Sequence, residues 1–319
     1  MRTKDISEKE EISRYRFLKK TATVCKIIRF VLLFAAGSIL VHEEVILKKK
    51  VSIPSLALLI SLSVLAFVLE NMLRKKYQGH LADAIDLVSM YKTYLDNVTY
   101  SADTGINSRD FAYRGIFQEL SMIKVSGAYG VAGQYQGRDF KGSNAVICQS
   151  DPVQGDGSEG LSLFLYKGYI SILSLEKLVN ESLLLIRSSE TNRINTDFKK
   201  CLLRAMKFVE PGHRKKTTGV IPLEGELGEV WEAFCKDELY AKKILVKGGG
   251  FYKKLFKDQT LDFIIFKGKE VIIGGQYLLH LAGKDIEKMK AVCQKSIENL
   301  FLQGITCVES AMSMMKDIK

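Results

Sequence analysis

VSIPSLALLISLSVLAFVL, residues 51–69, is a stretch of 19 residues without a single charge. As a helix it would be about 28 Å long, which matches the roughly 30 Å hydrocarbon core of a bilayer. Twelve of its positions are Leu, Ile, Val or Phe, whose insertion into a membrane is favourable. Pro54 lies near its start, where proline does least harm to a helix. We interpret the stretch as a transmembrane helix; the alternative is a fully buried helix of a soluble protein.

A second apolar stretch, FVLLFAAGSILV at residues 30–41, precedes the first. Its helix would be about 18 Å long, too short to span a bilayer alone. It reaches spanning length if it begins near residue 24, with Lys26 and Arg29 extending back to the headgroups, or if it continues through residues 45–47. A signal peptide is the alternative, but another apolar stretch follows directly. Spans at about 24–46 and 51–72 would form a transmembrane α-helical hairpin.

The basic residues are concentrated around these apolar stretches. Of the net charge of +11, residues 1–76 contribute 15 Lys and Arg against 7 Asp and Glu, and residues 77–319 contribute 32 against 29. Cytoplasmic flanks of membrane spans carry such an excess, so the pattern predicts an integral protein of the cytoplasmic membrane with both termini in the cytoplasm. The residues expected at the membrane interface are Lys26, Arg29, Arg74, Lys75 and Lys76.

Beyond residue 76 the pattern becomes that of an α+β soluble domain. Residues 77–100 carry apolar residues at helical spacing, which predicts a connecting helix. The clearest β-hairpin covers residues 261–273 and turns at Lys267-Gly268-Lys269, and an amphipathic helix is expected over residues 284–302. Other strand candidates are residues 144–149, 161–173 with an interruption at Lys167-Gly168, 183–187 and 218–223, while residues 198–208 suit helix or strand.

These elements predict a domain order. An N-terminal tail (1–23) and the hairpin (24–73) precede the connecting helix, the α+β domain covers residues 101–303, and a C-terminal tail covers residues 304–319.

Three segments have residue types found in ligand sites. Gly127, Gly130 and Gly133 have neither dinucleotide-binding nor P-loop spacing, so turns or bulges between strands are expected instead. The glycines at 248–250, after Lys247, precede a basic helix that could hold an anion, and a basic loop near residue 214 could contact a membrane or an acidic partner. Solvated basic surface is the alternative for both. The residues concerned are Arg214, Lys215, Lys216, Lys253 and Lys254.

The chain carries none of the usual enzyme or metal-site motifs. Its six cysteines are dispersed without a C-x-x-C pair, and no histidine has a carboxylate or cysteine at ligand spacing. No aromatic platform accompanies the basic clusters, so we expect no nucleic-acid partner. We assign no catalytic, cofactor-binding or metal-binding residue, and we expect no cofactor.

The order of the segments resembles a bacterial family of uncharacterised two-span membrane proteins. The matching parts are the two apolar stretches before Arg74, the segment Phe140-Lys141-Gly142, residues 164–173 and 183–186, residues 230–234 leading to Leu245, and the hairpin at 263–273. The resemblance covers most of residues 24–280. It implies a transmembrane hairpin followed by a cytoplasmic α+β domain with no assigned activity, and a role in assembly beside other small membrane-anchored proteins.

The leading hypothesis is a non-enzymatic, membrane-anchored protein whose cytoplasmic domain binds a partner, such as another membrane-anchored protein. The alternatives are a membrane-tethered enzyme with a site assembled from dispersed residues, and a sensor of membrane lipid or stress. A pocket that gathers polar residues would indicate the enzyme, and an exposed apolar patch would indicate the partner-binding protein.

Overall fold

The computed structural model of the chain describes residues 2–42, 53–117, 122–150, 162–188, 194–209, 218–246, 260–276 and 285–309, apart from residues 177, 224, 225 and 307. The chain divides into two compact units, Met1–Leu87 and Val88–Lys319.

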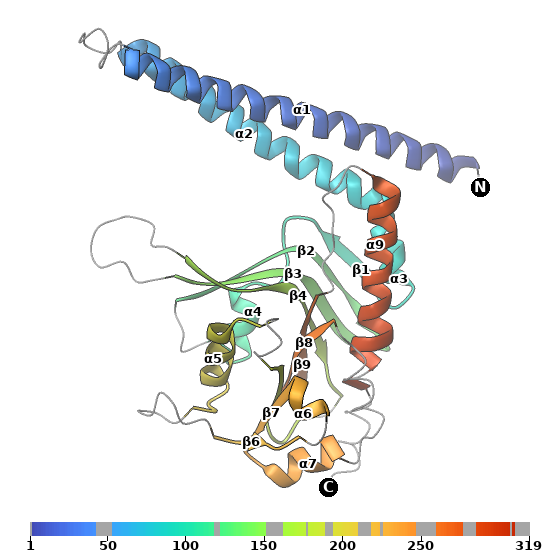
Figure 1. The fold of residues 1–319 in the computed structure, drawn as a ribbon. Helices are drawn as coiled ribbons and strands as arrows, with labels where there is room; N and C mark the ends of the chain where they lie inside the picture. Colours follow the sequence, from blue (N-terminus) through green and yellow to red (C-terminus); the bar gives the residue numbers. More distant parts are fainter. Residues whose placement is uncertain are drawn as a thin grey trace. The chain divides into compact units, whose positions relative to one another are not determined.

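The first unit is a hairpin of two long helices, α1 (Arg2–Leu40) and α2 (Ile53–Ala84), blue and cyan in Figure 1. α1 is one helix of 39 residues that contains both the expected N-terminal tail and the first apolar stretch. The helix continues from the expected tail at 1–23 into the apolar stretch without a break, because residues 12–29 contain no Gly or Pro that would interrupt it.

The expected connecting helix over residues 77–100 is divided into three elements. α2 continues to Ala84, a short helix α3 (Leu87–Lys92) follows, and the first strand begins at Asp96. Asp86 has a φ of 54° at the break. This left-handed conformation does not continue a right-handed helix, so α2 ends here.

The second unit is built on one antiparallel sheet. Its nine described strands lie in the order β1-β2-β3-β4-β9-β8-β5-β7-β6, and all neighbours are antiparallel. The strands are β1 (Asp96–Ser101), β2 (Ile123–Tyr135), β3 (Arg138–Ser150), β4 (Ser162–Ser174), β5 (Leu183–Arg187), β6 (Val220–Ile221), β7 (Trp231–Cys235), β8 (Leu261–Lys267) and β9 (Glu270–Gly275). The helices of this unit besides α3 are α4 (Ser108–Tyr113), α5 (Thr196–Ala205), α6 (Glu226–Val230), α7 (Glu238–Val246), α9 (Ile286–Asn299) and its continuation η3 (Leu300–Ile305). The α+β class predicted from the sequence is confirmed.

Two local predictions are confirmed and one is wrong. The strand at 183–187 and the hairpin of β8 and β9 are present, the latter turning at Gly268 with a φ of 61°. The interruption expected at Lys167-Gly168 is absent, because β4 runs through it without a break. Gly168 lies beneath the ring of Tyr166, and a side chain there would overlap this ring. The glycine therefore makes room for an aromatic residue within the strand.

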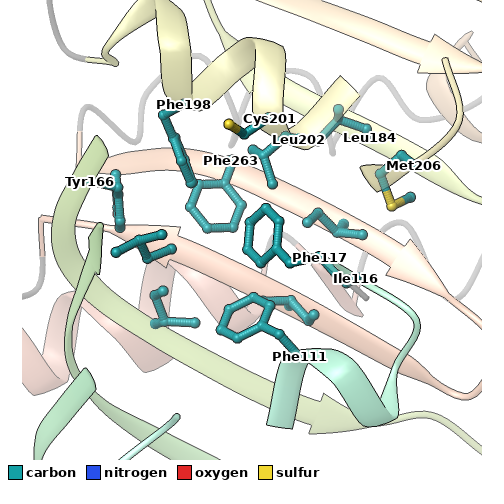
Figure 2. Packing of buried hydrophobic residues seen from close by; sticks show 14 of the residues in the cluster. Phe111, Ile116, Phe117, Tyr166, Leu184, Phe198, Cys201, Leu202, Met206 and Phe263 are labelled. Atoms are coloured by element: carbon teal, nitrogen blue, oxygen red, sulfur yellow. The ribbon is translucent and has the colours of Figure 1, made fainter. Parts of the chain in front are cut away.

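One face of the sheet is covered by α4 and α5. Phe111 of α4 and Phe198 of α5 pack in a single apolar cluster with strand residues that include Tyr166 and Phe263, as Figure 2 shows. α5 begins after Asn195, whose side chain accepts a hydrogen bond from the Asp197 N–H at 2.8 Å. This cap satisfies a backbone donor that the helix itself leaves unpaired.

The opposite face is covered by α3 and by the C-terminal helix. The hydroxyl groups of Tyr91 on α3 and Tyr169 on β4 lie 2.9 Å apart, and their burial raises the pKa of both. The Phe301 ring of η3 stacks on that of Tyr94, with centroids 4.6 Å apart. The helix extends into the expected C-terminal tail at 304–319, where Ile305 and Val308 are fully buried.

The three glycines at 127, 130 and 133 lie inside β2 rather than in turns. A Cβ atom at Gly127 would lie 2.6 Å from the Ile106 nitrogen and 2.7 Å from the Ser143 hydroxyl oxygen. The pairing of β2 with β3 is irregular around Gly130. The Gly130 N–H donates to the Thr104 carbonyl instead, at 2.8 Å. The glycine spacing is therefore explained by close backbone packing, which includes a bulge in the strand.

We predict that Gly127→Val destabilises the domain. The added side chain would displace backbone at Ile106, so we expect a cost of about 3 kcal/mol, the upper end of the usual range for overpacking. A loss of that size would lower the melting temperature of the purified chain by about 6 to 12 °C. Ser126→Ala is the matched control, because Ser126 is the exposed neighbour in the same strand. Equal melting temperatures for the two variants would contradict this account of the glycines.

Candidate functional site

The two helices of the hairpin meet along a seam with heptad spacing. Shielded residues recur at alternating steps of three and four on both helices, the pattern of antiparallel coiled-coil packing. On α1 the seam contains Tyr15, Leu18, Ala22, Cys25, Arg29, Leu32, Ala36 and Ile39. On α2 it contains Leu56, Leu59, Ser63, Ala66, Glu70, Leu73 and Tyr77. Ala22, Ala36, Ser63 and Ala66 are the small, buried members, and such residues let two helix backbones approach closely.

Outside the seam, the hairpin exposes large apolar side chains on both helices. We call this set the apolar band: Val24, Ile27, Ile28, Phe30, Val31, Leu33, Phe34 and Val41 on α1, and Ile53, Leu58, Ile60, Leu62, Val64, Leu65, Phe67, Val68, Leu69 and Met72 on α2. Each is more than 40% exposed, and Phe34 is 79% exposed. Both helices are long and apolar enough to cross a membrane. In water this much apolar surface would be strongly unfavourable.

An ion pair crosses the seam within the apolar band. The Arg29 guanidinium lies 3.0 Å from the Glu70 carboxylate, and the two side chains are 18% and 15% exposed. The guanidinium also lies over the rings of Phe30 and Phe67, 5.1 Å from each centroid. Carboxylate and aromatic faces together compensate the arginine charge where little water is present.

The five residues expected at a membrane interface divide into two groups. Lys26, Arg74, Lys75 and Lys76 are exposed, as an interfacial position requires. Arg29 does not extend outward but turns into the seam toward Glu70. Sequence reasoning missed this partner, although Arg29 is seven residues from both Ala22 and Ala36, and Glu70 is seven from Ser63. Arg214, Lys215, Lys216, Lys253 and Lys254 lie outside the described residues.

The second unit has a network of charged side chains where α4 meets β3 and β9. The Lys141 ammonium lies 2.8 Å from both carboxylate oxygens of Asp110. Arg114 donates from Nη2 to Glu270 Oε1 at 2.8 Å. Each charge in the network therefore faces an opposite charge. These ion pairs connect α4 to the sheet, and none of their charged groups is left unpaired for a reaction.

Besides the tyrosines, one lysine and two cysteines near this sheet have shifted pKa values. Lys267 donates from Nζ to the Gly115 carbonyl at 2.8 Å, and its pKa is lowered first by burial and then by the nearby charge of Lys207. Burial raises the pKa of the Cys201 and Cys235 thiols, which disfavours the nucleophilic thiolate. Within the described ranges, no three His, Cys, Asp or Glu side chains come together as a metal site.

Comparison with known proteins gives little further information. No family model matches the chain, and no curated protein matches it. The crystal structure of the mycobacterial trehalose monomycolate transport factor A, TtfA, resembles it with a TM-score of 0.31 and 8% identity, over 69% of this chain and 93% of that one. A likeness this weak carries no argument about function.

We predict that the Arg29 and Glu70 side chains are energetically coupled. Glu70→Gln leaves the Arg29 guanidinium without a counter-charge, and Arg29→Met leaves the Glu70 carboxylate without one. The loss of unfolding free energy in the double variant should therefore be smaller than the sum of the losses in the two single variants. The expected coupling is on the order of 1–3 kcal/mol. It is measured by denaturant unfolding of the full chain in mixed micelles, followed by circular dichroism.

The matched control for this cycle pairs Lys26→Met with Glu70→Gln. Lys26 is exposed on the same helix, so its effect should add to that of Glu70→Gln. Equal coupling in both cycles would mean that the ion pair has no specific role in the hairpin.

Proposed function

We propose that the chain is a membrane-anchored protein in which α1 and α2 cross the bilayer as a hairpin. The observation that carries the proposal is the apolar band, which covers both helices outside their seam. From Ile53 to Met72 the band is about 28 Å long, close to the hydrocarbon thickness of a bilayer. A lipid environment would bury this surface, while the seam buries the few polar side chains between the helices.

The direction of the hairpin supports a cytoplasmic location for both ends. α1 and α2 lie side by side and antiparallel, so two spanning helices would return the chain to the side on which it began. The exposed Arg16, Lys20, Arg74, Lys75 and Lys76 belong to that end of the hairpin. The positive-inside rule then favours the cytoplasmic face of the cytoplasmic membrane.

We infer that the α+β domain binds a protein partner at this face rather than catalysing a reaction. Charged side chains that lie close together in its described part are joined to each other: Asp110 with Lys141, Arg114 with Glu270, Lys199 with Glu232, and Arg138 with Glu309. These pairs connect separate elements and support a structural role. Exposed Leu163 and Phe164 on β4 offer apolar surface of the kind that partner proteins cover.

Membrane insertion is tested with Phe34→Arg and Leu62→Arg, which place a charge on each helix of the band. Near a span centre such a charge costs about 2.5 to 3.5 kcal/mol, so the double variant should be extracted by alkaline carbonate while the unaltered chain stays in the membrane pellet. A reporter fused after Lys319 gives the orientation. Cytoplasmic activity is expected, and alkaline-phosphatase activity would reverse the proposed topology.

Thr93→Arg is the control for insertion, because Thr93 is exposed in the turn after α3, outside the apolar band. It should remain in the pellet. Complete carbonate extraction of the unaltered chain would contradict a membrane-spanning hairpin.

The partner-binding role is tested by cross-linking in intact cells, followed by detergent solubilisation and purification of the full chain. A discrete cross-linked complex should form, and Leu163→Glu with Phe164→Glu should reduce its yield at least threefold if those residues are buried by the partner. Val220→Glu, at an exposed apolar position of another strand, is the matched control. Recovery of the chain alone, without any complex, would contradict the role.

A further inference from the structure

Two basic segments far apart in the sequence reach the same level of the hairpin. The rings of Tyr15 and Tyr77 meet at 5.8 Å between centroids, which fixes the alignment of the antiparallel helices at this point. Arg16 and Lys76 are the sequence neighbours of these two tyrosines, so they lie at the same end of the hairpin. Lys20 lies within about one helical turn of the level of Arg74. We call the five exposed residues of this level the basic collar: Arg16, Lys20, Arg74, Lys75 and Lys76.

The charges of the collar are available to a ligand. All five side chains are exposed, and none of them has an ion-pair partner among the residues that the structure describes. Three other basic residues of the hairpin already contact neighbouring side chains. Arg14 lies 2.7 Å from Glu10, Lys19 donates to the Tyr15 hydroxyl at 2.9 Å, and Arg29 contacts Glu70. The collar therefore retains net positive charge on both helices.

The collar directly adjoins the apolar band. Met72, the last member of the band on α2, is two residues from Arg74, and Phe17 is 70% exposed at the level of the collar itself. From Lys20 to Leu40, α1 rises about 30 Å, the thickness of the hydrocarbon core. If the band lies in the hydrocarbon, the collar lies at the depth of the lipid phosphates.

We propose that the basic collar is a binding site for the headgroups of anionic phospholipids, formed jointly by α1 and α2. The inference rests on the proposed membrane-spanning hairpin and adds the class of lipid that it recognises. Guanidinium and ammonium groups suit phosphate oxygens, and each charge near an anionic surface contributes about 1 kcal/mol. A zwitterionic lipid such as phosphatidylcholine lacks the net charge that would favour this site.

The test uses the purified full chain in a neutral detergent, titrated with phosphatidylglycerol or phosphatidylcholine in mixed micelles. Native mass spectrometry counts the bound lipids and gives an apparent Kd for each. Two variants separate the halves of the collar: Arg16→Gln with Lys20→Gln on α1, and Arg74→Gln with Lys75→Gln and Lys76→Gln on α2. The matched control is Lys124→Gln with Lys288→Gln and Lys295→Gln, three exposed lysines of the second unit.

The unaltered chain should bind phosphatidylglycerol more tightly than phosphatidylcholine. Loss of three charges on α2 should weaken phosphatidylglycerol binding on the order of a hundredfold, at about fivefold per charge. Loss of two charges on α1 should weaken it by more than tenfold, because the two helices share the site. The control variant should bind as the unaltered chain does, and all variants should retain its melting temperature.

Three results would overturn the lipid assignment while leaving the anchor intact. These are equal affinity for the two lipids, an α1 variant with unchanged affinity, and an unchanged preference in both collar variants. Equal lipid affinity together with loss of a cross-linked protein from the collar variants would assign the collar to an acidic protein partner instead. Extraction of the unaltered chain by alkaline carbonate would contradict the anchor itself, so the two failures are distinguishable.

Discussion

Arg29 stands between Ile28 and Phe30, both exposed apolar residues, and its charge is met inside the hairpin by Glu70 at 3.0 Å. Nearer the start of α1, Tyr15 meets Tyr77 across the same seam. The small residues of the seam allow the close approach that this contact needs. The alignment of the two helices determines which side chains are exposed together. The apolar band and the basic collar both result from it.

The sheet of the second unit is covered on both faces, and this determines where its polar groups can lie. The apolar cluster beneath α4 and α5 fills one face, while Tyr91, Tyr169 and Phe301 fill much of the other. Opposite charges meet where helices contact the sheet, as Lys141 and Asp110 do and as Arg114 and Glu270 do. This arrangement supports a domain whose described polar groups hold its own elements together, with apolar residues such as Phe164 available at the surface.

The features predictable from the sequence are those with a local cause. The apolar stretches, the strand at 183–187 and the hairpin around Gly268 each follow from hydrophobicity or turn chemistry within a few residues. The partner of Arg29 is 41 positions away, and the basic collar exists only after the helices are aligned. The interruption predicted at Gly168 was wrong because this glycine makes room for the ring of Tyr166. Such a packing contact cannot be read from composition. Val292 of α9 is 42% exposed although it is apolar, because the buried face of this helix is formed by Ile286, Met289, Cys293 and Ile297.

The contact of strand glycines with aromatic rings constrains how this protein can evolve. Gly142 lies under the Tyr169 ring, Gly168 under that of Tyr166, and Gly274 under that of Phe263. At Gly142 and Gly274 a larger residue requires a smaller one at the ring above it. At Gly168 an added side chain would also meet the Gly275 carbonyl oxygen, so none of these positions can change freely alone. In descendants of this chain the members of each pair should covary, and a single exchange should be deleterious unless the second accompanies it.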